Sequence, residues 1–184
     1  MDVYARHNIN ILGEGHGPTI LLAHGFGCDQ NIWRLIVDRL KSDFRLVLFD
    51  LVGAGSSDPG AWDAAKYSSL AGHAADVVDI VDELDLREVL FVGHSVSAMI
   101  GALAVIAEPS RFSKLVLLTP SPCYIDEDDY RGGFSKTDID ELLQSSCHPG
   151  QGDLFVPTAL LELLEPPVGE VHVAPARGRP AQSN

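Results

Sequence analysis

Short apolar runs alternate, over the first two thirds of the chain, with segments whose apolar residues recur at every third or fourth position. Four runs are continuous and rich in branched side chains, which predicts buried strands. They are Thr19-Ile20-Leu21-Leu22-Ala23, Leu46-Val47-Leu48-Phe49, Val89-Leu90-Phe91-Val92 and Leu115-Val116-Leu117-Leu118. Helical spacing predicts a helix after Asp29, a second over residues 70–84 and a third over 98–107. Because parallel neighbours need crossover connections, this alternation predicts an α/β fold, with a mostly parallel sheet and helices on both faces.

The helical segments also predict which side chains face the core. Over residues 70–84 the inward positions are Ala74, Val77, Val78 and Val81, and the outward positions are Asp76, Asp79, Asp82 and Glu83. The segment 98–107 is apolar on nearly every side, so we expect neighbouring elements to cover it. Residues 3–12 are expected to add an antiparallel edge strand or a hairpin.

The pattern changes at about residue 125. An acidic run, Asp126-Glu127-Asp128-Asp129, precedes a turn at Gly132-Gly133 and a short helix expected over residues 135–144. Prolines become frequent beyond residue 156, so we expect little regular structure from residue 166 onward.

Charge and cysteine content exclude several classes of protein. There are 26 acidic and 13 basic side chains, for a net charge of −13. This balance argues against a nucleic-acid-binding surface and against binding to anionic membranes. The first residues lack the apolar region of a signal peptide. The longest run of small apolar residues is about half as long as a segment that spans a bilayer. Cys28, Cys123 and Cys147 show no paired spacing, which argues against disulfides and zinc and favours the cytoplasm.

The sequence Gly93-His94-Ser95-Val96-Ser97 lies between a predicted strand and a predicted helix. A serine in this setting sits on a sharp turn, and the residues two positions before and after it must be small because the chain doubles back. Gly93 meets this demand, and Ser97 is also small, although a second glycine is usual there. The alternative interpretation makes Ser95 a helix N-cap and nothing more.

Two backbone N–H groups are expected beside Ser95. Val96 opens the following helix, so its N–H has no acceptor within that helix. The loop His24-Gly25-Phe26-Gly27 follows an earlier strand and brings a second donor, for which the N–H of Phe26 is the best candidate. Each donor would stabilise the oxyanion of an acyl-transfer transition state by about 3 kcal/mol. We therefore interpret Ser95 as a nucleophile.

The remaining candidates have simpler interpretations. Asp50, at a strand end, is expected to organise its loop by accepting N–H bonds. Gly53-Ala54-Gly55 lacks the helix start that a dinucleotide site requires. His24 and His94 are expected to brace loops rather than transfer protons, and His73 to lie at the surface or in packing.

Five segments within residues 5–145 carry a resemblance to a known family. They are His24-Gly25-Phe26-Gly27-Cys28-Asp29-Gln30, Leu48-Phe49-Asp50-Leu51-Val52-Gly53-Ala54-Gly55-Ser56, Gly93-His94-Ser95-Val96-Ser97-Ala98-Met99-Ile100-Gly101, Pro120-Ser121-Pro122-Cys123-Tyr124 and Gly132-Gly133-Phe134. With these segments the chain resembles the α/β-hydrolases. It is most similar to the branch that includes the bacterial stress regulator RsbQ and the plant strigolactone and karrikin receptors, where a serine at position 97 is typical.

The resemblance implies a Ser-Asp-His triad and an apolar pocket under a helical lid. It implies an oxyanion hole from the N–H groups of Phe26 and Val96, with Gly25, Gly93, His94 and Ser97 in support. The implied activity is slow hydrolysis of a small apolar ester or lactone, with a role in stress signalling of the sigma-B regulator type and a PP2C-type phosphatase as partner. No metal or organic cofactor is implied. On this basis residues 1–124 form the hydrolase core, 125–145 begin the lid, and 146–184 form a divergent, poorly structured tail.

The chain departs from the family pattern after about residue 145. The family carries its histidine in a late Gly-His sequence, and none follows Gly93-His94. Asp153 and His172 stand in the right order but too close together, so we expect the triad Asp and His to be absent. We therefore interpret the chain as truncated or frame-disrupted, with weak or no turnover. A sensor that works with a PP2C-type phosphatase and a nonfunctional fragment remain as alternatives.

Overall fold

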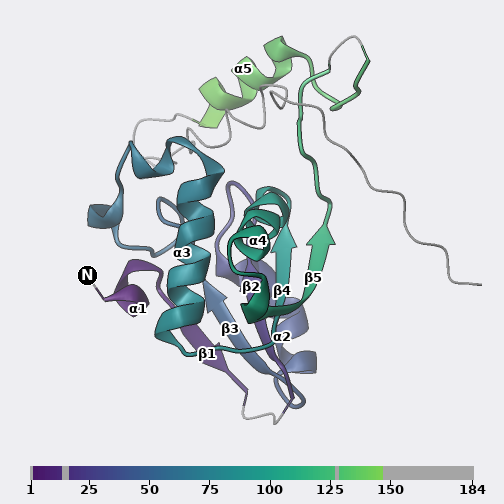
Figure 1. Ribbon diagram of the computed structural model, residues 1–184. Coiled ribbons are helices and arrows are strands. Elements are labelled where there is room, and N and C mark those ends of the chain that lie inside the picture. The colour runs from purple at the N-terminus through teal and green to yellow at the C-terminus, as the bar shows by residue number, and fades with distance from the viewer. Residues whose placement is uncertain (1, 14–16, 127–128, 147–184) are drawn as a thin grey trace, which may run out of the picture.

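The computed structural model describes residues 2–13, 17–126 and 129–146, and its centre is a five-stranded sheet (Figure 1). The strands are β1 (Asn10–Leu12), β2 (Thr19–Ala23), β3 (Arg45–Phe49), β4 (Val89–His94) and β5 (Phe112–Leu118). Their spatial order is β1-β3-β2-β4-β5, with β1 antiparallel to β3 and all other neighbours parallel. The four predicted strands and the mostly parallel sheet are confirmed. The antiparallel edge strand predicted within residues 3–12 is confirmed for Asn10–Leu12 only, because Val3–Arg6 form a helix.

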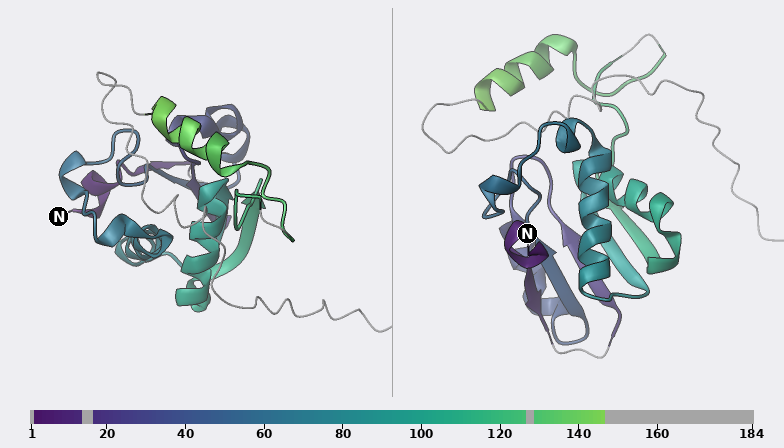
Figure 2. Two further views of the ribbon diagram at one scale, coloured as in Figure 1. Left: turned by 90° about the horizontal axis from the view of Figure 1, so that it is seen from above. Right: turned by 60° about the vertical axis from the view of Figure 1, so that its left-hand side comes forward.

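Helices connect these strands in the predicted places. The α-helices are α1 (Val3–Arg6), α2 (Arg34–Leu40), α3 (Leu70–Glu83), α4 (Val96–Ala107) and α5 (Lys136–Ser146), and the 3-10 helices are η1 (Gln30–Trp33), η2 (Pro59–Ala61), η3 (Lys66–Ser68) and η4 (Pro109–Arg111). Asp29 caps η1, which leads into α2, because its carboxylate accepts the N–H of Asn31 at 2.8 Å. α5 lies beyond the carboxyl ends of the strands (Figures 1 and 2). None of the helices described has both the length and the apolar character that crossing a membrane requires.

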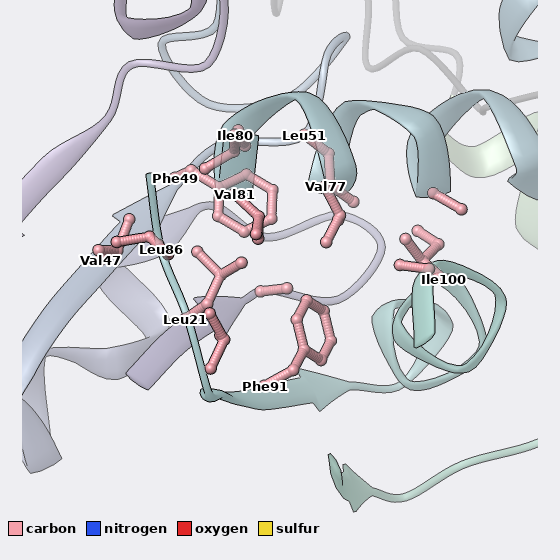
Figure 3. Packing of buried hydrophobic residues seen from close by; sticks show 14 of the residues in the cluster. Leu21, Val47, Phe49, Leu51, Val77, Ile80, Val81, Leu86, Phe91 and Ile100 are labelled. Atoms are coloured by element: carbon pink, nitrogen blue, oxygen red, sulfur yellow. The ribbon is translucent and has the colours of Figure 1, made fainter. Parts of the chain in front are cut away.

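The central strands contribute side chains to two hydrophobic clusters, one on each face of the sheet. Successive residues of a strand point to opposite faces, so Leu21 and Ile20 belong to different clusters. One cluster joins the sheet to α3 and α4 (Figure 3); it includes Leu21, Val47, Phe49, Phe91, Val77, Ile80, Val81 and Ile100. The other joins it to η1 and α2, and consists of Ile20, Leu22, Leu46, Leu48, Trp33 and Val37. Helices therefore cover both faces of the sheet, as the sequence predicts.

The predicted outward position of Asp76 on α3 is wrong. The structure buries Asp76, with 1% of its surface exposed. Two elements outside α3 supply cations to its Oδ1, which lies 2.6 Å from Nζ of Lys66 and 3.7 Å from Nη1 of Arg6. A carboxylate can be buried only with such partners, and the periodicity of α3 alone does not reveal them.

The expected covering of α4 is also wrong for the part of the chain that the structure describes. Ile106 is 76% exposed and Leu103 is 38% exposed. β5, the edge strand beside α4, exposes more than a third of Val116 and of Leu117. The outer side of this edge is therefore apolar and open among the described residues.

Candidate active site

Ser95 occupies a strained turn between β4 and α4. Its backbone angles are φ 56° and ψ −121°, in a region that residues with a side chain rarely adopt. The turn is held by the N–H of Ser95, which donates to the carbonyl oxygen of Leu118 at 2.9 Å. Ser95 stands at the N-cap position of α4, but its side chain makes no capping hydrogen bond. The N-cap interpretation therefore does not explain this serine.

Small residues on both sides of Ser95 allow the chain to double back. A Cβ atom added to Gly93 would collide with the backbone carbonyl group of Ser97. Ser97 is fully buried, and its hydroxyl donates to the carbonyl oxygen of His24 at 2.5 Å. Ser97 is therefore small enough for a position where glycine is usual, and its hydroxyl also links α4 to the end of β2 by a hydrogen bond.

The hydroxyl of Ser95 is half-buried and lies 3.1 Å from the hydroxyl of Tyr124. Tyr124 belongs to a small turn in which the N–H of Phe134 donates to the Tyr124 carbonyl oxygen at 3.1 Å and residues 125 and 134 form a β-bridge. Tyr124 was not predicted as a site residue. The only sequence signal for it is its place in the segment after β5 that carries the family resemblance.

The loop after β2 reaches the same turn. A Cβ atom on Gly25 would lie 2.6 Å from Nδ1 of His94 and 3.2 Å from Cβ of Ser95, so only glycine permits this approach. The next residue, Phe26, donates its N–H to no other described residue. Val96 is the first residue of α4, so its N–H has no acceptor within the helix. The fold thus brings the loop that carries Phe26 against the turn of Ser95, and the role of the Phe26 and Val96 N–H groups as oxyanion donors stays a prediction.

His24 braces the loop at this site, as predicted. Its Nε2 accepts the N–H of Leu51 at 3.0 Å, which leaves the proton on Nδ1 to be donated to the carbonyl oxygen of Gly25 at 2.8 Å. Burial lowers the pKa of His24, so its ring is neutral near pH 7. With both nitrogens engaged, His24 is not free to act as a base. Nδ1 of His94 is buried and has no hydrogen-bond partner among the residues described.

Asp50 organises the neighbouring loop, and this prediction is confirmed. Its carboxylate accepts the N–H groups of Gln30 and Ser56 and the side-chain amide of Asn8, each at 2.9 Å. Gly55 has a φ of 57°, and a Cβ atom there would lie 2.5 Å from the Asp50 carboxylate. Residues 53–55 therefore use their glycines to fold the loop around Asp50.

A cavity of about 450 Å³ opens beside these loops. Gly25, Phe26 and Val96 contribute to its wall, so it adjoins the turn that carries Ser95. The rest of the wall is formed by His24, Gly27, Cys28, Asp29, Asn31, Ile32, Arg34, Leu51, Val52, Gly53, Ala54, Gly55, Leu70, His73 and Ile100. Its size is that of a site for a small molecule.

Two of the three residues needed for a triad are not found in the described part of the chain. Asp153 and His172 lie outside it, as does His148. Among residues 2–13, 17–126 and 129–146, Ser95 Oγ has one hydrogen-bond partner, the Tyr124 hydroxyl. In the same ranges, no group of three His, Cys, Asp or Glu side chains is placed to hold a metal ion.

The strand order and the serine on the turn after β4 define an α/β-hydrolase fold. A family model described as the alpha/beta hydrolase fold matches residues 18–145. The chain belongs to the α/β-hydrolase family, as the sequence resemblance implied.

Known relatives agree with this assignment. The chain is 49% identical over 139 residues to a probable esterase of Oryza sativa subsp. japonica, a match that covers 76% of this chain and 51% of the relative. It is 47% identical to the karrikin insensitive 2 receptor CA of Petunia hybrida, with the same shares covered. A solved structure of a hydrolase from Oleispira antarctica is similar, with a TM-score of 0.74 and 46% identity over 78% of this chain and 52% of that one. The chain spans about half the length of the curated relatives it matches.

Proposed function

We propose that the chain acts as a serine hydrolase that cleaves a small apolar ester or lactone, with Ser95 as nucleophile. The observation that supports this most strongly is the strained backbone of Ser95, with a half-buried hydroxyl and no capping bond. A strained conformation persists only where the surrounding structure enforces it, and such residues concentrate at functional sites.

The proposed reaction forms an acyl-enzyme. Ser95 Oγ attacks the carbonyl carbon of the ester, and the N–H groups of Phe26 and Val96 stabilise the negative charge that develops on the carbonyl oxygen. The C–O bond of the ester breaks, and the proton lost by the Ser95 hydroxyl goes to the leaving oxygen, which becomes an alcohol. Water then attacks the acyl-enzyme, the bond to Ser95 Oγ breaks, and Oγ regains a proton as the acid is released. Tyr124, at 3.1 Å, would orient the Ser95 hydroxyl in this step.

Turnover by this chain should be slow. A serine hydroxyl needs a base to accept its proton, and Ser95 has no such partner among the described residues. An oxyanion hole without a base still leaves about 10³- to 10⁴-fold acceleration over water in the serine protease that has been dissected residue by residue. We propose that the chain retains a residual rate acceleration of this kind.

A second candidate function is that of a sensor in stress signalling whose turnover is incidental. The similarity to a protein named as a karrikin insensitive receptor favours it, together with the cavity beside Ser95. In this interpretation a bound ligand would alter the surface over residues 126–134, and a PP2C-type phosphatase would recognise that surface. Two free thiols, Cys28 and Cys123, support the cytoplasm as the compartment.

Labelling with a fluorophosphonate tests the nucleophile. Ser95 Oγ would attack phosphorus and release fluoride, and we expect one label per folded chain, detected by mass spectrometry. Ser95→Ala should abolish the label, whereas Ser110→Ala, which removes an exposed serine in η4, should keep it. Absence of label on the folded chain, or equal labelling of the Ser95→Ala variant, would refute the proposal.

Binding to a purified PP2C-type phosphatase tests the sensor. Arg131→Glu, in the exposed part of residues 129–134, should weaken binding in an interferometry assay, and Arg87→Glu, at another exposed site, should not. Equal binding by both variants, or no binding by the unaltered chain, would speak against this partner.

A further inference from the structure

His73 is a buried polar side chain that the proposed reaction does not use. It lies on α3, is 1% exposed, and forms part of the wall of the cavity beside Ser95. Neither of its ring nitrogens has a hydrogen-bond partner among the described residues. A buried polar group without a partner costs about 1–3 kcal/mol. Such a group in a cavity wall needs an explanation.

The cavity wall that includes His73 is mostly apolar. Leu70, Val96 and Ile100 belong to it, together with the polar side chains of Asp29, Asn31 and Arg34. The ring of Tyr67 packs against the imidazole in a tilted arrangement, with the ring centres 4.8 Å apart and the planes at 34°. The ring is therefore fixed in position by packing rather than by hydrogen bonds.

The charge state of His73 limits what it can bind. Burial lowers its pKa to about 4, and this outweighs the opposite effect of the Asp76 carboxylate. At neutral pH the imidazole is uncharged, with one nitrogen that donates and one that accepts. Such a group pairs with a hydroxyl or a carbonyl oxygen and offers no charge to balance a carboxylate.

We propose that the cavity binds a neutral, largely apolar ligand that carries a hydroxyl or carbonyl group away from the reacting ester, and that His73 hydrogen-bonds this group. The inference rests on the proposed function, since it specifies the substrate class of the same cavity. His73 is in this view a specificity-determining residue: it favours ligands that satisfy its nitrogens and rejects purely apolar ones of the same shape.

A matched pair of ligands tests the inference without requiring turnover. The probes are 4-ethylphenol and 4-ethyltoluene, which differ by a hydroxyl in place of a methyl group, titrated into the full chain carrying Ser95→Ala. We expect 4-ethylphenol to bind about tenfold more tightly, which is the worth of one hydrogen bond to a buried group. Adding His73→Phe, which keeps a ring against Tyr67, should remove the difference. Adding His7→Phe, which removes a buried imidazole outside the cavity wall, should retain it.

A spectroscopic readout covers the case in which the His73→Phe variant does not fold. The ring nitrogen resonances of His73, observed in the Ser95→Ala chain, should shift on saturation with 4-ethylphenol and remain in place with 4-ethyltoluene. Equal affinities for the two probes, no binding of either, or unmoved His73 resonances would overturn the inference. A failure of the proposed function would appear instead as absent fluorophosphonate labelling, with the tenfold preference intact.

Discussion

Close backbone approaches at three small residues hold the candidate site together. Gly25 permits the loop after β2 to touch His94, Gly93 permits the backbone of Ser97 to pass, and the Ser97 hydroxyl bonds the carbonyl oxygen of His24. Together these contacts join the ends of β2 and β4 to the start of α4. The surrounding contacts therefore fix the position of Ser95, although its backbone conformation is one that a serine rarely adopts.

Gly93→Ala should be strongly destabilising. The added methyl group meets a backbone carbonyl that cannot rotate away, and overpacking of this kind costs about 1–3 kcal/mol. Urea unfolding followed by circular dichroism measures the loss. Gly60→Ala is the control, because its Cβ would meet only an Asp58 carboxylate oxygen at 3.2 Å, so a change within about 0.5 kcal/mol is expected. Equal losses in both variants would show that the tight approach at Gly93 is not a constraint.

At the scale of elements, α4 has one buried face and one open face. Ile100 is fully buried against the sheet and α3, whereas Ile106 is 76% exposed. The helix begins at the candidate nucleophile, so its buried face sets the position of Ser95 in the molecule. The open face lies beside the exposed edge of β5.

Alanine substitutions distinguish the two faces of α4. Ile100→Ala removes buried methyl groups and should lower the free energy of unfolding by about 2–5 kcal/mol. Ile106→Ala should change it by no more than about 0.5 kcal/mol, since alanine also favours helices. Thermal and urea unfolding of both variants measure these values. A loss above about 2 kcal/mol for Ile106→Ala would mean that another segment or molecule covers this face in solution.

The elements were largely predictable because their signals are local. Four apolar runs indicated the strands, and the position of Asp29 indicated the start of η1. The errors arose where burial depends on distant segments. Asp76 is buried because Lys66 and Arg6 come to it, and α4 is partly open because no described strand lies beyond β5.

At the scale of the whole molecule, the site follows from topology. In parallel sheets, ligands bind beyond the carboxyl ends of the strands. The loop of Phe26 follows β2, Asp50 follows β3 and Ser95 follows β4. The sequence predicted that the loop of Phe26 meets the turn of Ser95. It did not predict the contact of Tyr124 with Ser95 or the position of His73 in the cavity wall, since both depend on contacts between residues far apart in the chain.

Stability of the whole molecule should fall in mild acid. Burial is the main cause that lowers the pKa of His7, His24 and His73, the last from 6.5 to about 4. Between those two values the unfolded chain binds a proton at position 73 that the folded chain does not, so the free energy of unfolding decreases as pH falls. Well above pH 6.5 both states are neutral there and the effect vanishes. For His73 alone the expected loss between about pH 7 and pH 5 is about 2 kcal/mol.

Urea unfolding at a series of pH values measures this loss, and His73→Phe isolates the contribution of one ring. Around His73 the Asp76 carboxylate favours protonation, while Lys66, His7 and His24 oppose it. These neighbours remain in the variant. Between about pH 7 and pH 5 the variant should therefore lose about 2 kcal/mol less of its free energy of unfolding than the unaltered chain. The three exposed aspartates with lowered pKa, Asp38, Asp63 and Asp138, titrate below this interval and do not contribute to it. Parallel pH profiles for the two proteins would mean that His73 is already protonated, or solvated, in the folded state.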